Sequence, residues 1–180
     1  MDQNSELHWF PMRITYNREL KIKELLDRDH IENFLPMKYD FVDTADGRRR
    51  MLVPAIHNLL FVRSTKEHLT DLKMHKQEFQ PMRYMTQRTQ DGGGILVVPD
   101  KQMDNFMKVA SVQDDSVMFL DNEDYLKRVG QRVQVIDGCF GGVEGVIKRI
   151  KKNKRVVVQI EGVAAVAIAF VPSAFLRFID

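Results

Sequence analysis

The spacing of apolar residues predicts helices and short strands over residues 1–110. Residues 9–15 mix apolar and polar side chains as a strand with one buried face does. Ile22, Leu25 and Leu26 form one stripe of an amphipathic helix over residues 19–29, with Asn17 as its N-cap. A further helix begins at Pro99-Asp100, and its apolar stripe at i, i+3, i+4 and i+7 consists of Met103, Phe106, Met107 and Ala110.

Turn and cap signals place the remaining elements of this half. Residues 31–42 and 59–63 are extended, and the Asp-Gly pair in residues 43–47 predicts a hairpin because it tolerates positive φ. Ser64 and Glu67 have the spacing of a capping box, which predicts a helix ending near His75. A strand at 81–85, a glycine-rich loop at 86–94 and a strand at 95–98 complete the order. We predict an α+β domain, an antiparallel sheet flanked by helices.

From residue 128 onward the pattern predicts strands alone. Five short runs are expected to be strands, namely 132–136, 145–150, 155–160, 166–171 and 175–178. A small closed barrel is the economical solution because closure removes exposed strand edges, and Asn153 is expected in one tight turn. Residues 111–127 are polar apart from residues 117–120, and we expect a partly structured linker between domain 1–110 and domain 128–180.

Composition and charge refine this outline. The chain is 44% hydrophobic and 29% charged, as ordinary globular proteins are. Its longest apolar run, residues 163–171, is far shorter than the ~20 residues of a membrane helix, and the N-terminus does not have a signal-peptide pattern, so we expect a cytoplasmic protein with no membrane partner. Residues 128–180 hold nine Lys and Arg against four Asp and Glu, whereas the rest holds eighteen against twenty-one. The C-terminal part is therefore better suited to a polyanion.

No set of residues predicts enzymatic chemistry. Cys139 is the single cysteine, which excludes an internal disulfide and a CxxC zinc knuckle, and it has no evident histidine partner for thiol catalysis. The five histidines are not paired at metal-ligand spacing. Gly92 to Gly94 are not followed by the Lys and Ser or Thr of a P-loop. We expect a protein that is not an enzyme and uses no metal and no cofactor.

Two parts of the chain carry a resemblance to known families. Residues 131–138, Phe140 with the two glycines after it, and residues 144–146 resemble the KOW motif, which opens an SH3-like barrel. KOW modules also occur in ribosomal proteins, so they do not decide function. Trp9-Phe10 and the segments 24–26, 31–36 and 54–62 are similar, in order and spacing, to the N-terminal domain of the NusG transcription factors.

Two departures from the common NusG pattern point to a specialised paralogue. His57-Asn58-Leu59 stands where the family usually has Pro-Gly followed by an aromatic residue. Residues 97–103 resemble paralogues of the RfaH and UpxY type, which antiterminate long polysaccharide operons. The resemblance implies a transcription elongation and antitermination factor that binds RNA polymerase and suppresses pausing or termination. A KOW-type RNA-binding or ribosome-associated protein is the alternative function.

The resemblance also implies functional surfaces in the N-terminal domain. An apolar polymerase-binding patch is expected to include Trp9, Ile56, Leu59 and Phe61, although each could instead be a core residue. Contacts with non-template DNA or nascent RNA are expected from Tyr16, Arg18, Lys21, Arg28, Arg48, Arg49 and Arg50. The alternatives for these seven residues are a solvated helix face and charges that protect a sheet edge.

In the barrel, Phe140 and six basic residues are the expected KOW partner-binding residues. The basic residues are Lys148, Arg149, Lys151, Lys152, Lys154 and Arg155. The partner would be a small-subunit ribosomal protein or the Rho terminator, and the alternatives are a solvated turn and a Phe140 that caps the barrel. One type of paralogue refolds this domain from helices to strands, but Val156 to Val158 predict a stable barrel here. We expect a monomer.

Overall fold

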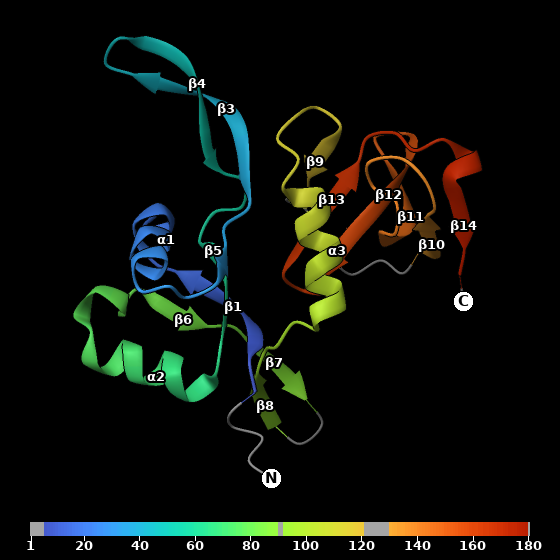
Figure 1. Ribbon diagram of the computed structural model, residues 1–180. Helices are drawn as coiled ribbons and strands as arrows, with labels where there is room; N and C mark the ends of the chain where they lie inside the picture. Colours follow the sequence, from blue (N-terminus) through green and yellow to red (C-terminus); the bar gives the residue numbers. More distant parts are fainter. Residues whose placement is uncertain (1–5, 90–91, 121–129, 180) are drawn as a thin grey trace. The chain divides into compact units, whose positions relative to one another are not determined.

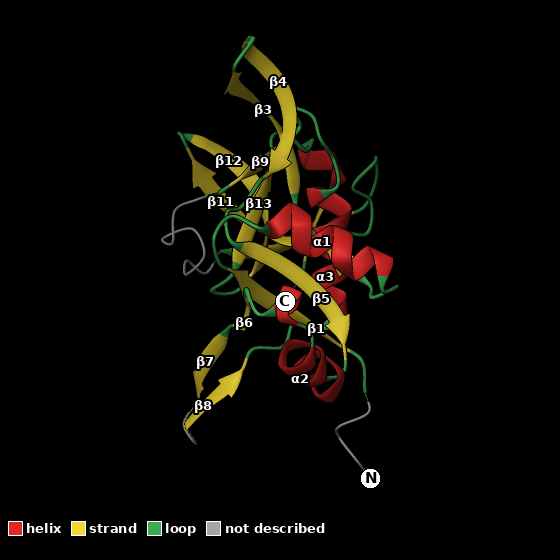
Figure 2. Ribbon diagram, turned by 90° about the vertical axis from the view of Figure 1, so that its left-hand side faces the viewer, coloured by secondary structure: helices red, strands yellow, loops and turns green. Residues whose placement is uncertain are grey.

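The computed structural model describes residues 6–89, 92–120 and 130–179, and the chain divides into two compact units. The first consists of Met1–Pro36 and His57–Asp100, and the second of Met37–Ile56 and Lys101–Asp180. The fold class is the predicted one, an α+β N-terminal part followed by a β-rich C-terminal part (Figures 1 and 2).

The first unit is built on a four-stranded antiparallel sheet with the order β2-β5-β1-β6 (Figure 1). Its strands are β1 (His8–Ile14), β2 (Asn33–Phe34), β5 (Leu59–Ser64) and β6 (Met82–Tyr84). The central strands β1 and β5 pair with Phe10 opposite Val62 and Pro11 opposite Phe61. Because neighbouring residues of a strand point to opposite faces, this register sorts the side chains into two sets.

One face of this sheet packs against helix α2 (Lys66–His75). Phe10 and Tyr84 share that face, and their ring centroids lie 5.8 Å apart. The Tyr84 hydroxyl donates a hydrogen bond to the Lys66 carbonyl of α2, at 3.2 Å. Leu69 and Leu72 of α2 are buried, as are Ile22 and Leu26 of helix α1 (Glu19–Arg28). The apolar stripe predicted for α1 is therefore correct apart from Leu25, which is only partly buried.

The predicted caps of both helices are each displaced by one residue. Asn17 does not cap α1, because Tyr16 and Asn17 form a left-handed turn with φ of 66° and 51°, and Arg18 becomes the N-cap without a side-chain hydrogen bond. The capping box at Ser64 and Glu67 is also wrong. Ser64 is the last residue of β5, so Thr65 caps α2 and its side chain accepts a hydrogen bond from the His68 N–H at 3.1 Å.

A buried carboxylate at the start of α1 contacts the turn before β5. Glu19, the first residue of α1, is only 3% exposed and accepts a hydrogen bond from the backbone N–H of Asn58. Asn58 has a φ of 60° and lies directly before β5, where its carbonyl accepts a hydrogen bond from the Ile14 N–H of β1. Glu19 thus ties the start of α1 to the turn that sets the pairing of β1 with β5.

The loop predicted for residues 86–94 is instead a second hairpin. Strands β7 (Thr86–Thr89) and β8 (Gly92–Ile95) pair antiparallel, with Thr86 opposite Ile95. Glycines indicate flexibility in a sequence, but a ladder is made by backbone groups and glycine supplies both of them. The predicted strand 95–98 is reduced to the end of β8 and to a single bridge between Val98 and Trp9.

In the second unit a long hairpin and helix α3 (Asp100–Ala110) accompany a six-stranded antiparallel sheet. The hairpin pairs β3 (Met37–Thr44) with β4 (Gly47–Pro54), as the Asp-Gly turn predicted. The sheet has the order β14-β10-β11-β12-β13-β9, and its strands are β9 (Val117–Phe119), β10 (Gln131–Val135), β11 (Glu144–Ile150), β12 (Asn153–Ile160), β13 (Ala164–Ile168) and β14 (Leu176–Phe178). All five predicted C-terminal strands are present, as is the preference for strands over helices, but the strand predicted over residues 166–171 is β13, which begins at Ala164 and ends at Ile168.

One detail of this sheet refines the sequence interpretation, which expected a partly structured linker, and another differs from it. The apolar patch of the predicted linker forms β9, which pairs with β13 and places Leu120 in a core cluster with Ile150 and Val157. Residues 121–127 of the predicted linker lie outside the described residues. The turn between β11 and β12 is made by Lys151 and Lys152, whose φ values are 46° and 72°, and Asn153 is the first residue of β12.

We expect that Glu19→Ala lowers the free energy of unfolding by about 1.5–3 kcal/mol, because it removes a buried charged acceptor from its hydrogen bond with the Asn58 N–H. Urea denaturation followed by circular dichroism measures this. The matched control is Glu24→Ala, a change at an exposed position of the same helix with an expected effect within about 0.5 kcal/mol. Equal losses in the two variants would show that the Glu19 hydrogen bond does not stabilise the fold.

Candidate functional site

Three of the four predicted polymerase-binding residues lie on one face of the first sheet. In the register of β1 with β5, Trp9, Leu59 and Phe61 share the face opposite to that of Phe10. They are 3%, 4% and 0% exposed, so each is a core residue in this structure, as the core-packing alternative requires. Ile56, the fourth residue, is partly buried and precedes β5.

The same face ends in two exposed arginines. Arg13 of β1 stands opposite Leu59 and, on its other side, opposite Arg83 of β6. Both arginines are exposed, in contrast to the three apolar residues beside them. This face therefore combines a buried apolar centre with a positively charged rim, and sequence reasoning did not single out the rim. The alternation of polar and apolar residues along β1 is the signal that places Arg13 there.

The start of α1 presents an aromatic and basic surface. Tyr16 is 81% exposed, and the Arg18 guanidinium carbon lies 5.6 Å from the centre of its ring. Lys21 is exposed on the first turn of α1. An exposed ring with a guanidinium above it is suited to a flat anionic partner such as a nucleotide. The structure thus keeps three of the predicted nucleic-acid residues accessible.

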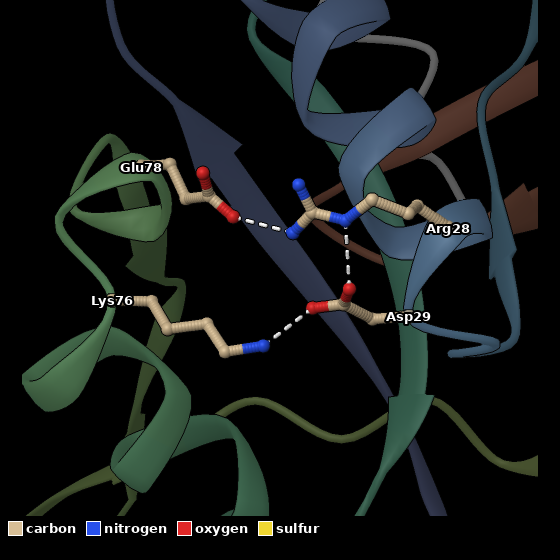
Figure 3. A network of polar contacts seen from close by, with 4 residues as sticks. All are labelled: Arg28, Asp29, Lys76 and Glu78. Atoms are coloured by element: carbon tan, nitrogen blue, oxygen red, sulfur yellow. Dashed lines mark hydrogen bonds and ion pairs between the residues drawn. The ribbon is translucent and has the colours of Figure 1, made fainter.

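Arg28, at the other end of α1, is held in a network of ion pairs (Figure 3). Its Nε donates a hydrogen bond to the Asp29 carboxylate at 2.9 Å, and its terminal nitrogen contacts Glu78. Lys76 donates to the second oxygen of Asp29 at 2.7 Å. Hydrogen bonds from Arg28 and then Lys76 lower the pKa of Asp29 to about 2. Arg28 therefore links α1 to residues 76–78. Its charge is already engaged by two carboxylates, which makes it less suited to bind a phosphate.

The three arginines of β4 are exposed, but they are not equivalent. Arg49 forms an ion pair with Asp46 at 3.3 Å. Arg48 and Arg50 instead lie over aromatic rings of β3, at 5.2 Å from the centre of Phe41 and 4.8 Å from the centre of Tyr39. The alternation of the hairpin accounts for this difference, because Arg48 and Arg50 share a face and Arg49 points to the other.

The basic cluster of the C-terminal sheet is smaller than the sequence predicts. Lys148 is 6% exposed and its Nζ donates a hydrogen bond to Gln159 at 2.7 Å. Arg155 is partly buried and donates to the Ala169 carbonyl at 2.9 Å. The four cations that remain at the surface are Arg149, Lys151, Lys152 and Lys154.

The aromatic residue that the barrel presents to solvent is not the predicted one. Phe140 is 6% exposed, which matches the alternative in which it caps the barrel. Phe170 is 78% exposed and follows β13. The strand predicted over residues 166–171 includes Phe170, but β13 ends at Ile168, and Pro172 is the signal that the strand does not continue. Phe178 is also exposed and, with Ile147 and Val156, lines an apolar groove of this sheet.

Within residues 6–89, 92–120 and 130–179, no three His, Cys, Asp or Glu side chains come together as metal ligands. In the same residues no helix has the length and apolar character needed to cross a membrane. The fold and its surfaces define a two-part protein, an α+β domain followed by a small β-barrel, in which exposed cations and aromatic rings are the distinctive surface chemistry.

Comparison of the sequence with protein-family models places this class of protein in a family. The family model of NusG, described as transcription termination factor nusG, matches residues 7–107, more than half of the chain. The chain therefore belongs to the NusG family of transcription factors, whose members typically bind RNA polymerase. A solved structure from Thermotoga maritima, described as domain interaction in NusG, shares 16% identity and a TM-score of 0.47, over 97% of this chain and 98% of that chain. No curated protein matches the chain.

The ion-pair network of Figure 3 predicts a pH-dependent contribution to stability. A carboxyl group whose pKa is lowered from 3.8 to about 2 stabilises the folded state above pH 3.8, and this contribution is lost as the pH falls through 2. We expect Asp29→Asn to be less stable than the wild type at pH 7 and equally stable below pH 2. Urea denaturation between pH 7 and pH 2 measures the difference, with Glu24→Gln as the control. A difference that persists unchanged at pH 2 would contradict the ion-pair origin.

Lys151 and Lys152 of the β11–β12 turn have positive φ values, so we predict that substitutions suited to this backbone stabilise the protein. Two-residue hairpin turns with positive φ at both positions favour Asn-Gly, and other residues are strained there. We expect Lys151→Asn with Lys152→Gly to raise the free energy of unfolding by about 1 kcal/mol, measured by urea denaturation. Lys151→Ala with Lys152→Ala removes the same charges without relieving the backbone. If both variants gain equally, charge repulsion and not backbone strain governs the turn.

Proposed function

We propose that this protein is a transcription elongation and antitermination factor that binds RNA polymerase and suppresses pausing or termination. The observation that carries the proposal is the match of the NusG family model to residues 7–107. The likeness of residues 97–103 to RfaH and UpxY paralogues supports the finer assignment, action on a long operon of the polysaccharide type. Such a factor works in the cytoplasm, beside the transcribing polymerase.

The face of the first sheet that carries Trp9, Leu59 and Phe61 is the proposed polymerase-binding surface, with Ile56 beside β5 as a further member. Its apolar residues are buried, so the surface that a partner meets first is the rim made by Arg13 and Arg83. The packed residues then hold the shape of the surface, and the arginines give it orientation.

The proposed nucleic-acid contacts fall into two groups. Tyr16, Arg18 and Lys21 at the start of α1 are exposed and free of carboxylate partners within 4 Å in the described part of the chain, whereas Arg28 is tied to Asp29 and Glu78. The arginines Arg48, Arg49 and Arg50 lie on the β3–β4 hairpin. Non-template DNA or nascent RNA is the proposed ligand, and its phosphates make binding sensitive to salt.

The C-terminal barrel is proposed to be a KOW module that contacts a second protein, a small-subunit ribosomal protein or the Rho terminator. Phe140 shapes the end of the barrel, and the exposed Phe170 is the aromatic residue available for contact. The turn at Lys151 and Lys152 also supports the second candidate function, an RNA-binding or ribosome-associated KOW protein, because its cations face solvent. Binding of RNA by the full chain that depends on this turn, with no affinity for polymerase, would favour that second function.

Single-round transcription by the host polymerase through a terminator tests the favoured function. We expect the wild-type protein to raise read-through and Arg13→Glu to abolish most of the gain, because a negative charge replaces a positive one at the rim of the docking face. Trp9→Ala with Phe61→Leu should act in the same direction by deforming that face. Circular dichroism establishes whether the Trp9→Ala, Phe61→Leu variant folds. If that variant does not fold, Arg13→Glu alone tests the docking face, because it changes an exposed residue.

Asp71→Lys is the matched control, since it changes charge at an exposed position of α2, which packs on the opposite face of the sheet. It should leave read-through at the wild-type level. If wild-type protein does not co-migrate with the elongation complex and does not change read-through, the proposed function is wrong. If all three variants behave as the wild type does, polymerase binds elsewhere on the protein.

A further inference from the structure

The β3–β4 hairpin has two faces of different chemistry, and neither is a core face. Cross-strand partners share a face, so Tyr39, Phe41 and Asp43 lie on one face with Leu52, Arg50 and Arg48 opposite them, respectively. Tyr39 is 46% exposed and Phe41 is 58% exposed. Large aromatic side chains left this accessible on a two-stranded ribbon do not contribute to a hydrophobic core.

On this face, which we call the aromatic face, rings and guanidinium groups alternate. Arg50 stands opposite Phe41 in the register but lies over the ring of Tyr39, at 4.8 Å. Arg48 stands opposite Asp43 but lies over the ring of Phe41, at 5.2 Å. Both guanidinium groups thus lean in the same direction, each toward the ring diagonal to it. The result is a series of ring, guanidinium, ring and guanidinium along the hairpin.

On the opposite face of the hairpin, the cations are paired with carboxylates. Lys38 pairs with Asp40 at 3.2 Å, and Arg49 pairs with Asp46 at 3.3 Å. Across the described residues, Arg48 and Arg50 have no carboxylate within 4 Å that would do the same. Among the cations of the hairpin, only Arg48 and Arg50 therefore have no ion pair in the described part of the chain, although the pKa of Asp40, which a hydrogen bond from the Phe41 N–H lowers most, is lowered also by Arg48 acting through space. Asp43, near the tip, is the one acidic residue in the register of that face.

Charge also indicates which part of the aromatic face a polyanion can use. A cavity at the base of the face is lined by Tyr39 and Arg50 together with Asp114 and Asp115 of the same unit. Hydrogen bonds from the side chain and the backbone N–H of Ser116 lower the pKa of Asp114, so its carboxylate stays ionised. The two carboxylates keep phosphates out of the cavity itself, so a strand would run along the exposed rings and guanidinium groups of the aromatic face and not into the cavity.

We propose that the aromatic face binds a single-stranded nucleic acid by stacking unpaired bases on Phe41 and Tyr39, while Arg48 and Arg50 contact the adjoining phosphates. Aromatic rings bind unpaired bases by stacking. The bases of a duplex are already stacked on one another and are not available to the rings. The inference rests on the proposed function for the nucleic-acid partner and deepens it. It assigns Tyr39 and Phe41 a role that the charge run at Arg48 to Arg50 alone does not predict.

Fluorescence anisotropy with the full chain tests this assignment. The probes are labelled (dT)20, (rU)20 and a DNA duplex of the same length. We expect Tyr39→Leu with Phe41→Leu to weaken binding of the single strands by about tenfold or more, with an unchanged salt dependence, because leucine keeps apolar bulk but has no π face. Arg48→Gln with Arg50→Gln should weaken binding and reduce the slope of log K against log salt by about 1.4.

Two controls on the opposite face match these variants. Lys38→Gln removes a positive charge and Met51→Ala removes exposed apolar surface, and both should bind the single strands within about twofold of the wild type. Whichever of (dT)20 and (rU)20 binds more tightly identifies the natural strand as DNA or RNA. Tighter binding of the duplex, or wild-type affinity in the leucine variant, would overturn the proposal. Loss in the arginine variant alone would show a phosphate contact without stacking.

Photocrosslinking gives an independent readout. A (dT)20 strand that contains 5-iododeoxyuridine should crosslink to the peptide with Tyr39 and Phe41, and the leucine variant should lose this crosslink. Co-migration of the same variants with RNA polymerase separates this inference from the proposed function. Variants that still bind polymerase but not single strands support the hairpin site, whereas wild-type protein that binds polymerase but no single strand at low salt refutes it and leaves the proposed function standing.

Discussion

The pairing of β1 with β5 is the constraint on which the first unit depends. Its register places Phe10 with the residues that pack on α2 and places Trp9 and Phe61 together on the other face. A shift by one residue would exchange the two sets, because side chains alternate along a strand. The turn before β5 holds this register through Asn58, and Glu19 holds the turn from α1. One buried carboxylate thus connects the helix, the sheet and the proposed docking face.

The arginines show how local partners decide what a positive charge can do. Arg28 is surrounded by carboxylates, which raise its pKa and tie it to residues 76–78. Arg18, Arg48 and Arg50 lie over aromatic rings, which orient a guanidinium without neutralising it. An ion pair removes most of the charge that a distant phosphate would sense, whereas a cation over a ring remains available to it. The arginines of this protein therefore have different roles: Arg28 is structural, whereas Arg18, Arg48 and Arg50 are available for binding.

Sequence reasoning predicted the elements well because alternation and helical spacing are local properties. It failed where a neighbour in space decided the outcome, as at Ser64, which β5 takes as its last residue, and at residues 86–94, which pair as strands. For the candidate sites, counting charges was insufficient. Lys148 and Arg149 are adjacent in β11 and so point to opposite faces, which leaves Lys148 buried. Because the sequence predicts a strand over residues 145–150, the alternation of side chains along it could have assigned Lys148 and Arg149 to opposite faces.

The boundary of the barrel illustrates the same difference between composition and pairing. Residues 111–127 read as a linker because they are polar, yet β9 within them covers the outer edge of β13, and Leu120 joins its core. An uncovered edge strand exposes backbone groups that can pair with other chains, and an apolar core that loses Leu120 is incompletely filled. β9 therefore contributes backbone pairing to the edge of the C-terminal sheet, and Leu120 contributes apolar contacts to its core.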